Sequence, residues 1–333
     1  LIQKKKNILV VVNSLFEANS LYSSLTGYTK NVYLFPMDDF LTSEAIAISP
    51  DLKINRLETL NVINFSDEPI IVITNLTGYL RYLPNKKVYK NAILNLSIGD
   101  NLSPKSLVEK LLSIGYIRDT IVSNTGDIGV RGFVVDVFPI NFDNPVRIEF
   151  FGDEIESIRL FDTKTQKSLS KLEKVTINPY TEFLCGKVVD ELHFGKQKYL
   201  PDYTSVMSLS GYFDDGYVVF KDYEQLASSY NNMLEEMTIY NEEKDADFNG
   251  NYMYNFSDIK NDYIIYYMSI NNITPSFASG TINFDIKTIN NFNENMDQIN
   301  KFIRDSLGDN KTVLICLKDY QLKTLSKKLN MNY

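Results

Sequence analysis

The chain has 333 residues, of which 44% are hydrophobic and 23% are charged, and its 34 Lys and Arg against 42 Asp and Glu give a net charge of −8. At about 150 residues per domain this length predicts two domains, or three small ones, and the composition is that of a chain with a hydrophobic core. No uninterrupted run of 18 apolar residues occurs, which excludes a transmembrane helix, and an acidic chain is a poor general binder of DNA.

The first hundred residues alternate between short apolar strands and helices. Continuous apolar runs rich in Val and Ile predict buried strands at residues 7–12, 32–35 and 69–74, the first of them following a basic start that does not have the form of a signal peptide. Helical spacing is found at residues 16–25, with Phe16, Leu21 and Leu25 on the apolar side, and at residues 57–62. Strands that alternate with helices predict a parallel α/β layer.

The pattern changes in the middle of the chain. Ser103 and Pro104 have the form of a helix start, and Gly115 that of a helix end. Residues 132–139 and 145–161 then alternate with period two, which predicts an antiparallel sheet. A change of this kind marks a domain boundary, which we place near residue 94.

From about residue 182 the α/β pattern returns. The predicted elements are a strand at 217–220, a long helix from Asp222, a solvated acidic excursion at 234–262, a helix at 296–307, a strand at 312–317 and a helix at 320–329. The chain then stops where another strand is expected, so we expect a fragment of a longer protein.

The predicted parallel layer lacks the sequence of a nucleotide site. A P-loop needs glycines and a lysine after a strand, so that backbone N–H groups cradle phosphates, but residues 13–18 are Asn-Ser-Leu-Phe-Glu-Ala. Residues 308–312, Gly-Asp-Asn-Lys-Thr, lack the first glycine and precede a strand. Asp38 and Asp39 follow a strand without a phosphate loop. We therefore expect a scaffold that resembles an ATPase but does not hydrolyse ATP.

Cysteine and histidine add little chemistry. Cys185 and Cys316 lie 131 residues apart, supply no disulfide framework and fit a reducing cytoplasm. One histidine, His193, cannot make the usual zinc sites with them. We expect a structural or surface role for His193.

The most informative stretch runs from Asn144 to Asp162. Gly152 and Asp153 predict a two-residue hairpin turn, and the predicted pairs are Phe151 with Glu154, Phe150 with Ile155, Glu149 with Glu156 and Ile148 with Ser157. One face then carries Val146, Ile148, Phe150 and Ile155, and the other carries Arg147, Glu149, Phe151, Glu154, Glu156 and Ile158. Arg and Phe among carboxylates are typical of an interface hot spot. The alternative is a solvated face with one stray aromatic side chain.

These residues resemble a known family. Residues 130–139 (Val-Arg-Gly-Phe-Val-Val-Asp-Val-Phe-Pro), 147–162 and 165–169 resemble domain 2 of the bacterial transcription-repair coupling factors (Mfd), a domain shared with the excision-repair protein UvrB. Residues 35–40, 49–52 and 56–60 resemble the N-terminal domain of that family. The similarity is weaker from 182 to 290 and partly returns at the end.

The resemblance implies an architecture and a site. The architecture is a degenerate RecA-like or UvrB-like α/β domain, built from residues 1–93 (domain 1a) and 182–333 (domain 1b) and interrupted by a small α+β domain with an antiparallel sheet at 94–181 (domain 2). Domain 2 of the family recruits the ATPase UvrA, and the family's contact residues correspond to Arg131, Arg147 and Phe151. The missing P-loop after Val12 favours a coupling factor over UvrB.

The same resemblance sets expectations for cofactors and partners. We expect no catalytic residue, cofactor or metal in this chain, because ATP and Mg²⁺ belong to motor domains beyond it in a full-length ATP-dependent DNA translocase. RNA polymerase and DNA are likewise expected to bind elsewhere; we expect a cytoplasmic location and no membrane partner. Two alternatives remain: a UvrB-like ATPase and a nucleic-acid-binding module. Residues 94–181 have no basic excess, with 10 Lys and Arg against 12 Asp and Glu.

Overall fold

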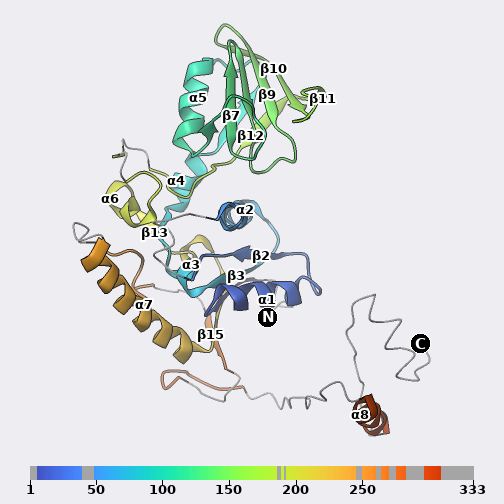
Figure 1. The fold of residues 1–333 in the computed structure, drawn as a ribbon, viewed down its shortest axis with the longest axis vertical. Coiled ribbons are helices and arrows are strands. Elements are labelled where there is room, and N and C mark those ends of the chain that lie inside the picture. Colours follow the sequence, from blue (N-terminus) through green and yellow to red (C-terminus); the bar gives the residue numbers. More distant parts are fainter. Residues whose placement is uncertain are drawn as a thin grey trace. The chain divides into compact units, whose positions relative to one another are not determined.

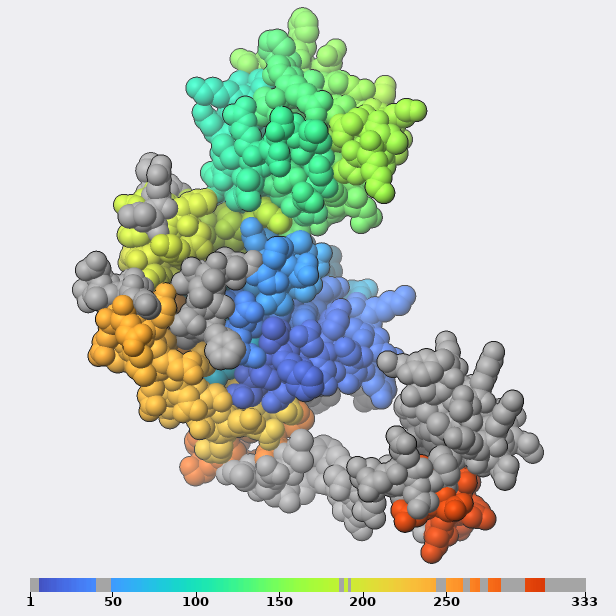
Figure 2. All heavy atoms as spheres, viewed as in Figure 1, coloured from blue at the N-terminus to red at the C-terminus, as the bar shows by residue number. Residues whose placement is uncertain are grey.

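The computed structural model describes the residues that Figure 2 draws in colour: 6–39, 49–185, 189–190, 193–244, 250–259, 264–269, 275–282 and 296–308. The chain forms two compact units, residues 1–278 and 279–333. The described part of the second unit contains helix α8 (Met296–Gly308), which agrees with the helix predicted at 296–307. The elements predicted at 312–317 and 320–329 lie outside the described residues.

A parallel sheet forms the first layer of the first unit, with the strand order β15-β14-β1-β3-β2 (Figure 1). Its strands are β1 (Asn7–Val12), β2 (Val32–Phe35), β3 (Ile71–Asn75), β14 (Gly216–Lys221) and β15 (Ile264–Met268). Ile8 to Val12 of the central strand are all buried, as a continuous β-branched run predicts. Four strands are confirmed, whereas β15 was not predicted, because its tyrosines lie beside a stretch rich in Asn and Asp.

Helices cover both faces of the parallel sheet. Ala18 of α1 (Leu15–Leu25) packs on the face that carries Ile8, Val10 and Val12. Apolar side chains of three other helices belong to the core on the face of Leu9 and Val11: α2 (Pro50–Phe65), α3 (Leu76–Leu80) and α7 (Tyr223–Lys244).

Two helix predictions are corrected. Phe16 is 80% exposed, because α1 turns Ala18 toward the sheet, with Leu21 and Leu25 packed partly against the same cluster. Helix α7 continues through Lys244, so the first part of the excursion predicted at 234–262 is helical.

A second sheet, almost entirely antiparallel, lies in the middle of the chain, with the order β11-β10-β9-β8-β7-β6. Its strands are β6 (Ile117–Arg118), β7 (Asp127–Arg131), β8 (Val134–Val137), β9 (Val146–Phe151), β10 (Glu154–Phe161) and β11 (Ser168–Leu172). Helix α5 (Pro104–Ser113) buries Leu107 and Leu111 in its core. The predicted helix start is confirmed, since the Ser106 N–H donates to Ser103 Oγ at 3.1 Å.

The chain enters and leaves this second sheet along neighbouring strands. β5 (Leu94–Ser97) pairs with β12 (Lys174–Ile177), with Leu94 opposite Ile177. Beyond β12, the buried Glu182 accepts hydrogen bonds from Arg56 Nε at 2.6 Å and Arg81 Nε at 2.7 Å. The remaining elements are short: β4 (Leu83–Pro84), β13 (Val206–Met207), α4 (Lys86–Asn91), α6 (Leu200–Tyr203) and the 3₁₀ turns η3 (Gln197–Tyr199) and η4 (Ser210–Tyr212).

Candidate protein-interaction site

The β9–β10 hairpin places the predicted site residues. Gly152 has φ +64° and begins the predicted two-residue turn. On either side of this turn, Phe151 lies opposite Glu154 and Phe150 lies opposite Ile155. The predicted core face is also confirmed, since its four apolar members are buried: Val146, Ile148, Phe150 and Ile155.

A β-bulge in β10 corrects the rest of the predicted pairing. Ser157 lies opposite Glu149 and Ile158 lies opposite Ile148, so the pairs of Glu149 with Glu156 and of Ile148 with Ser157 were wrong. The extra residue reverses the side-chain alternation. Ile158 is consequently buried on the core face and not on the outer face. The spacing of three between Ile155 and Ile158 was a signal of this bulge.

Phe151 and Arg131 reach the surface of the outer face. Phe151, the last residue of β9, is 79% exposed. Arg131, which alternation alone could not place, is exposed at the end of β7 opposite Val134, and Val134 is in turn opposite Glu149 of the outer face. Residues in one cross-strand row share a face. The structure therefore brings Arg131 onto the same outer face as Phe151.

Arg147 lies on this face as well, but its guanidinium is engaged within the chain. Its Nε and Nη2 donate to the two carboxylate oxygens of Asp136 at 2.7 and 2.8 Å, and Nη2 also donates to Gln166 Oε1 at 3.2 Å. The guanidinium stacks over the ring of Phe161, 4.4 Å from its centroid. The hydrogen bond with Asp136 raises the pKa of Arg147. Arg147 is thus paired with an acidic group of the chain itself.

Glu149 is also paired internally. Its carboxylate forms an ion pair with Arg159 and accepts a hydrogen bond from Ser157 Oγ at 2.8 Å. Burial by itself raises the pKa of Glu149, but the hydrogen bonds from Ser157 and Arg159 outweigh it and lower the pKa overall. Around Arg147, then, charges on the outer face are largely neutralised by neighbours.

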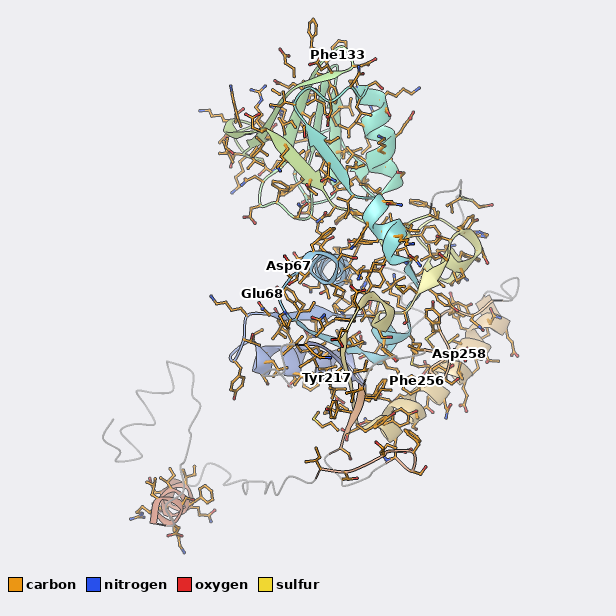
Figure 3. All side chains as sticks on the ribbon, turned by 180° about the vertical axis from the view of Figure 1, so that it is seen from behind. Asp67, Glu68, Phe133, Tyr217, Phe256 and Asp258 are labelled. Carbon is orange, nitrogen blue, oxygen red and sulfur yellow. The ribbon has the colours of Figure 1, made fainter. Side chains whose placement is uncertain are left out.

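One exposed residue beside this site was not singled out from the sequence. Phe133 is 61% exposed in the two-residue turn between β7 and β8, and Figure 3 shows its ring at the tip of this sheet, pointing outward. Its carbonyl oxygen accepts the Phe150 N–H at 2.9 Å, which places this turn beside the end of β9. Gly132, with φ +60°, was a sequence signal for the turn.

The carboxyl ends of the parallel strands are where α/β proteins usually bind ligands. There, the Asp39 carboxylate accepts hydrogen bonds from the Leu15 N–H and from Asn75 Nδ2, both at 2.8 Å. A helix N-terminus of this kind holds phosphate in a P-loop protein. At the start of α1, a carboxylate of the chain itself accepts a hydrogen bond from one of these N–H groups. Nearby, Lys221 forms an ion pair with Glu17.

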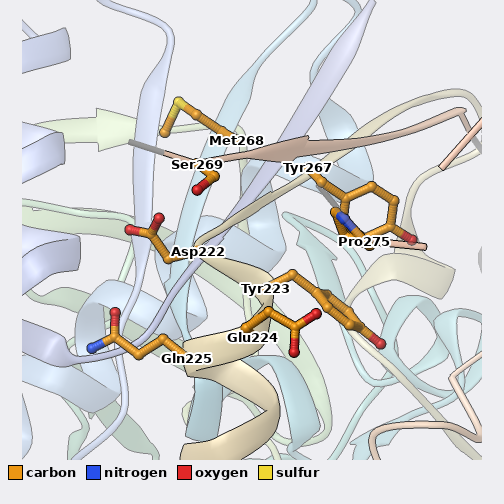
Figure 4. Close-up of a pocket in the computed structure, with 8 residues that line it drawn as sticks. All are labelled: Asp222, Tyr223, Glu224, Gln225, Tyr267, Met268, Ser269 and Pro275. Carbon is orange, nitrogen blue, oxygen red and sulfur yellow. The ribbon is translucent and has the colours of Figure 1, made fainter. Parts of the chain in front are cut away.

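A small cavity of about 130 Å³ lies at the ends of β14 and β15 (Figure 4). Asp222, Tyr223, Glu224, Gln225, Tyr267, Met268, Ser269 and Pro275 line it. The cavity is well below the roughly 300–1,000 Å³ typical of ligand pockets. Its lining carries two carboxylates and no Lys or Arg, which is unfavourable for a phosphate.

The part of the chain that the structure describes holds no cluster of three His, Cys, Asp or Glu side chains fit for a metal ion. The helices described there are too short or too polar to cross a membrane. The His193 ring stacks on Tyr199 with centroids 3.8 Å apart, and its Nδ1 lies 2.8 Å from the Tyr203 hydroxyl.

Comparison with known proteins first gives the class of the antiparallel region: residues 94–183 match the family model of the UvrB interaction domain. Over a longer stretch, the chain is similar to the transcription-repair-coupling factor of Bacillus subtilis strain 168, with 31% identity over 184 residues, which are 55% of this chain and 16% of that protein. The protein of the same name from Staphylococcus haemolyticus is 30% identical over 185 residues, 55% of this chain and 16% of its own length. The matched region thus spans about one sixth of these relatives, and the resemblance inferred from the sequence is confirmed.

Proposed function

We propose that this chain is the N-terminal, UvrA-recruiting region of a transcription-repair coupling factor, a protein-interaction module of transcription-coupled nucleotide excision repair. The match of residues 94–183 to the UvrB interaction domain carries this proposal. The exposed pair Arg131 and Phe151 supplies the docking chemistry, because arginine and aromatic side chains are enriched in interface hot spots.

The proposed architecture is one degenerate UvrB-like α/β domain, formed by residues 1–93 and 182–333 and interrupted by residues 94–181. Support comes from the parallel sheet, in which β14 pairs with β1 although some 200 residues separate them in sequence. Segments on both sides of the antiparallel region therefore contribute to one sheet.

In this proposal the three site residues act differently. Phe151 fills an apolar pocket of UvrA. Arg131 pairs with an acidic group there, because its planar guanidinium matches the geometry of a carboxylate. Arg147 uses Nε and Nη2 for its own Asp136, so only its Nη1 edge is left for the partner. Its main contribution is to hold the outer face in shape.

We also propose that the chain has no ATPase site. Support comes from Asp39, whose carboxylate accepts the Leu15 N–H where a phosphate would need a donor. In the full-length protein, ATP, Mg²⁺, DNA and RNA polymerase would bind to other regions, in the cytoplasm. The alternative, a UvrB-like ATPase, would need this helix N-terminus to be open.

Titration of UvrA with folded variants of residues 1–333 tests the recruiting function. Arg131→Ala and Phe151→Ala should each weaken binding by at least about 2 kcal/mol. Glu156→Ala, an exposed residue of the same hairpin, is the control and should have a smaller effect. Circular dichroism verifies that each variant is folded. Unchanged affinity in both Arg131→Ala and Phe151→Ala would overturn the proposed site.

A further inference from the structure

Two tight turns at one end of the antiparallel sheet each present an exposed phenylalanine. Phe133 follows Gly132 in the β7–β8 turn, and Phe151 precedes Gly152 in the β9–β10 turn. Both glycines have positive φ, which two-residue turns of this kind require at their first position. The hydrogen bond from the Phe150 N–H to the Phe133 carbonyl holds the β7–β8 turn against β9, one residue before Phe151.

Phe133 has no packing function within its own sheet. It belongs to neither core cluster of described residues, and 61% of its surface is exposed. A Cβ added at Gly132 or Gly152 would meet no atom within 4 Å, so both turns project into open space. Single exposed apolar residues are ordinary, but here two phenyl rings are held on adjacent rigid turns.

Charged groups surround these rings. Arg131 ends β7 just before the β7–β8 turn, Asp153 lies in the β9–β10 turn and Glu154 follows it, and all three are exposed. An apolar centre with a charged rim is the usual anatomy of a protein–protein contact. The cation beside Phe133 calls for an acidic group on the partner, and the rigid turns reduce the entropy lost on binding.

We propose that Phe133 is a second apolar anchor for the protein that docks on Phe151. This rests on the proposed function, so the partner is UvrA. UvrA then offers two apolar recesses, with an acidic group beside the one that takes Phe133. The two rings act together, and Phe133 adds selectivity to the contact that Arg131 and Phe151 make.

The experiment is a calorimetric titration of UvrA from the same organism with the complete chain and its variants. Phe133→Ser should weaken binding about tenfold or more, as expected for loss of a hot-spot aromatic residue. Phe133→Leu keeps most of the apolar surface and should stay within about threefold of the unsubstituted chain. Phe16→Ser removes an even more exposed phenylalanine from α1 and should leave the affinity unchanged.

The outcomes separate the two proposals. If the unsubstituted chain does not bind UvrA, the proposed function fails, and the second anchor fails with it. If Phe151→Ala weakens binding but Phe133→Ser does not, the recruiting function stands and the second anchor is wrong. Equal losses in Phe133→Ser and Phe133→Leu would contradict an apolar contact. Because Phe133 is exposed, Phe133→Ser should keep the urea midpoint, which confirms that any loss of affinity is local.

Discussion

The carboxyl edge of the parallel sheet and the turn end of the antiparallel sheet differ in how their side chains are paired. At the carboxyl edge of the parallel sheet, polar groups bind one another: Asp39 binds the Leu15 N–H, and Lys221 binds Glu17. At the turn end of the antiparallel sheet, Phe133 and Phe151 face solvent. An edge where α/β proteins commonly bind ligands can thus be occupied from within. The docking surface that we propose lies at the turn end of the antiparallel sheet, where these two phenylalanines are exposed.

The largest expected effect concerns the junction between the two regions. Glu182→Ala leaves Arg56 and Arg81 buried without their carboxylate, and should cost about 3–5 kcal/mol of unfolding free energy. Urea denaturation measures the loss. The exposed Glu173→Ala is the control, and a similar loss in both variants would contradict the importance of this triad.

The same triad predicts a pH dependence. Burial by itself raises the pKa of Glu182, but Arg56 and Arg81 outweigh it and lower the pKa overall. A carboxyl group whose pKa is lower in the folded state stabilises the fold fully at pH values above its pKa in the unfolded chain, about 4.3. This stabilisation is lost as the pH falls through the pKa of the folded state. The stability difference between the unsubstituted chain and Glu182→Ala should therefore shrink between pH 7 and pH 3. A stability difference that grows on acidification would show that folding raises the pKa of Glu182 and does not lower it.

Within the antiparallel sheet, neighbouring phenylalanines should behave differently. Phe150→Ala removes a buried ring and should destabilise the chain by about 3–5 kcal/mol. Phe151→Ala, which removes an exposed ring, should change stability by no more than about 0.5 kcal/mol. Denaturant melts compare the two, and equal losses would contradict the assignment of faces.

A smaller difference is expected between Arg147 and Arg131 of the outer face. Arg147→Ala leaves the buried Asp136 carboxylate without its bidentate partner, and should cost about 2 kcal/mol of stability. Arg131→Ala should lie within about 0.5 kcal/mol of the unsubstituted chain. Thermal melts of both variants test this, and a larger loss in Arg131→Ala would reverse the roles proposed for them.

The smallest expected signal is at the parallel edge. Because the chain's own carboxylate meets the start of α1, we expect no saturable binding of ATP with Mg²⁺ by residues 1–333 at micromolar concentrations. Calorimetry gives a direct measurement. A saturable micromolar isotherm would show that this edge opens, and would favour the ATPase alternative.

Local patterns predicted the strands and helices whose side chains follow a clear period. The β-branched run of residues 7–12 and the Ser103–Pro104 helix start are examples, since each depends on neighbouring residues alone. The bulge at Glu156 was missed because one extra residue reverses the alternation. The partner of Arg147 was missed because Asp136 lies on another strand, and the register that joins them is a tertiary property.

The pairing of β5 with β12 has a consequence for how such a chain can be assembled. Leu94 and Ile177 lie side by side, so the intervening segment begins and ends at nearly one point. Segments with adjacent ends can be placed in a surface connection of another fold at little cost to its geometry. The adjacent ends of residues 94–177 are what the insertion of a segment into a connection of an α/β layer requires, because the host strands on either side of it need not move apart.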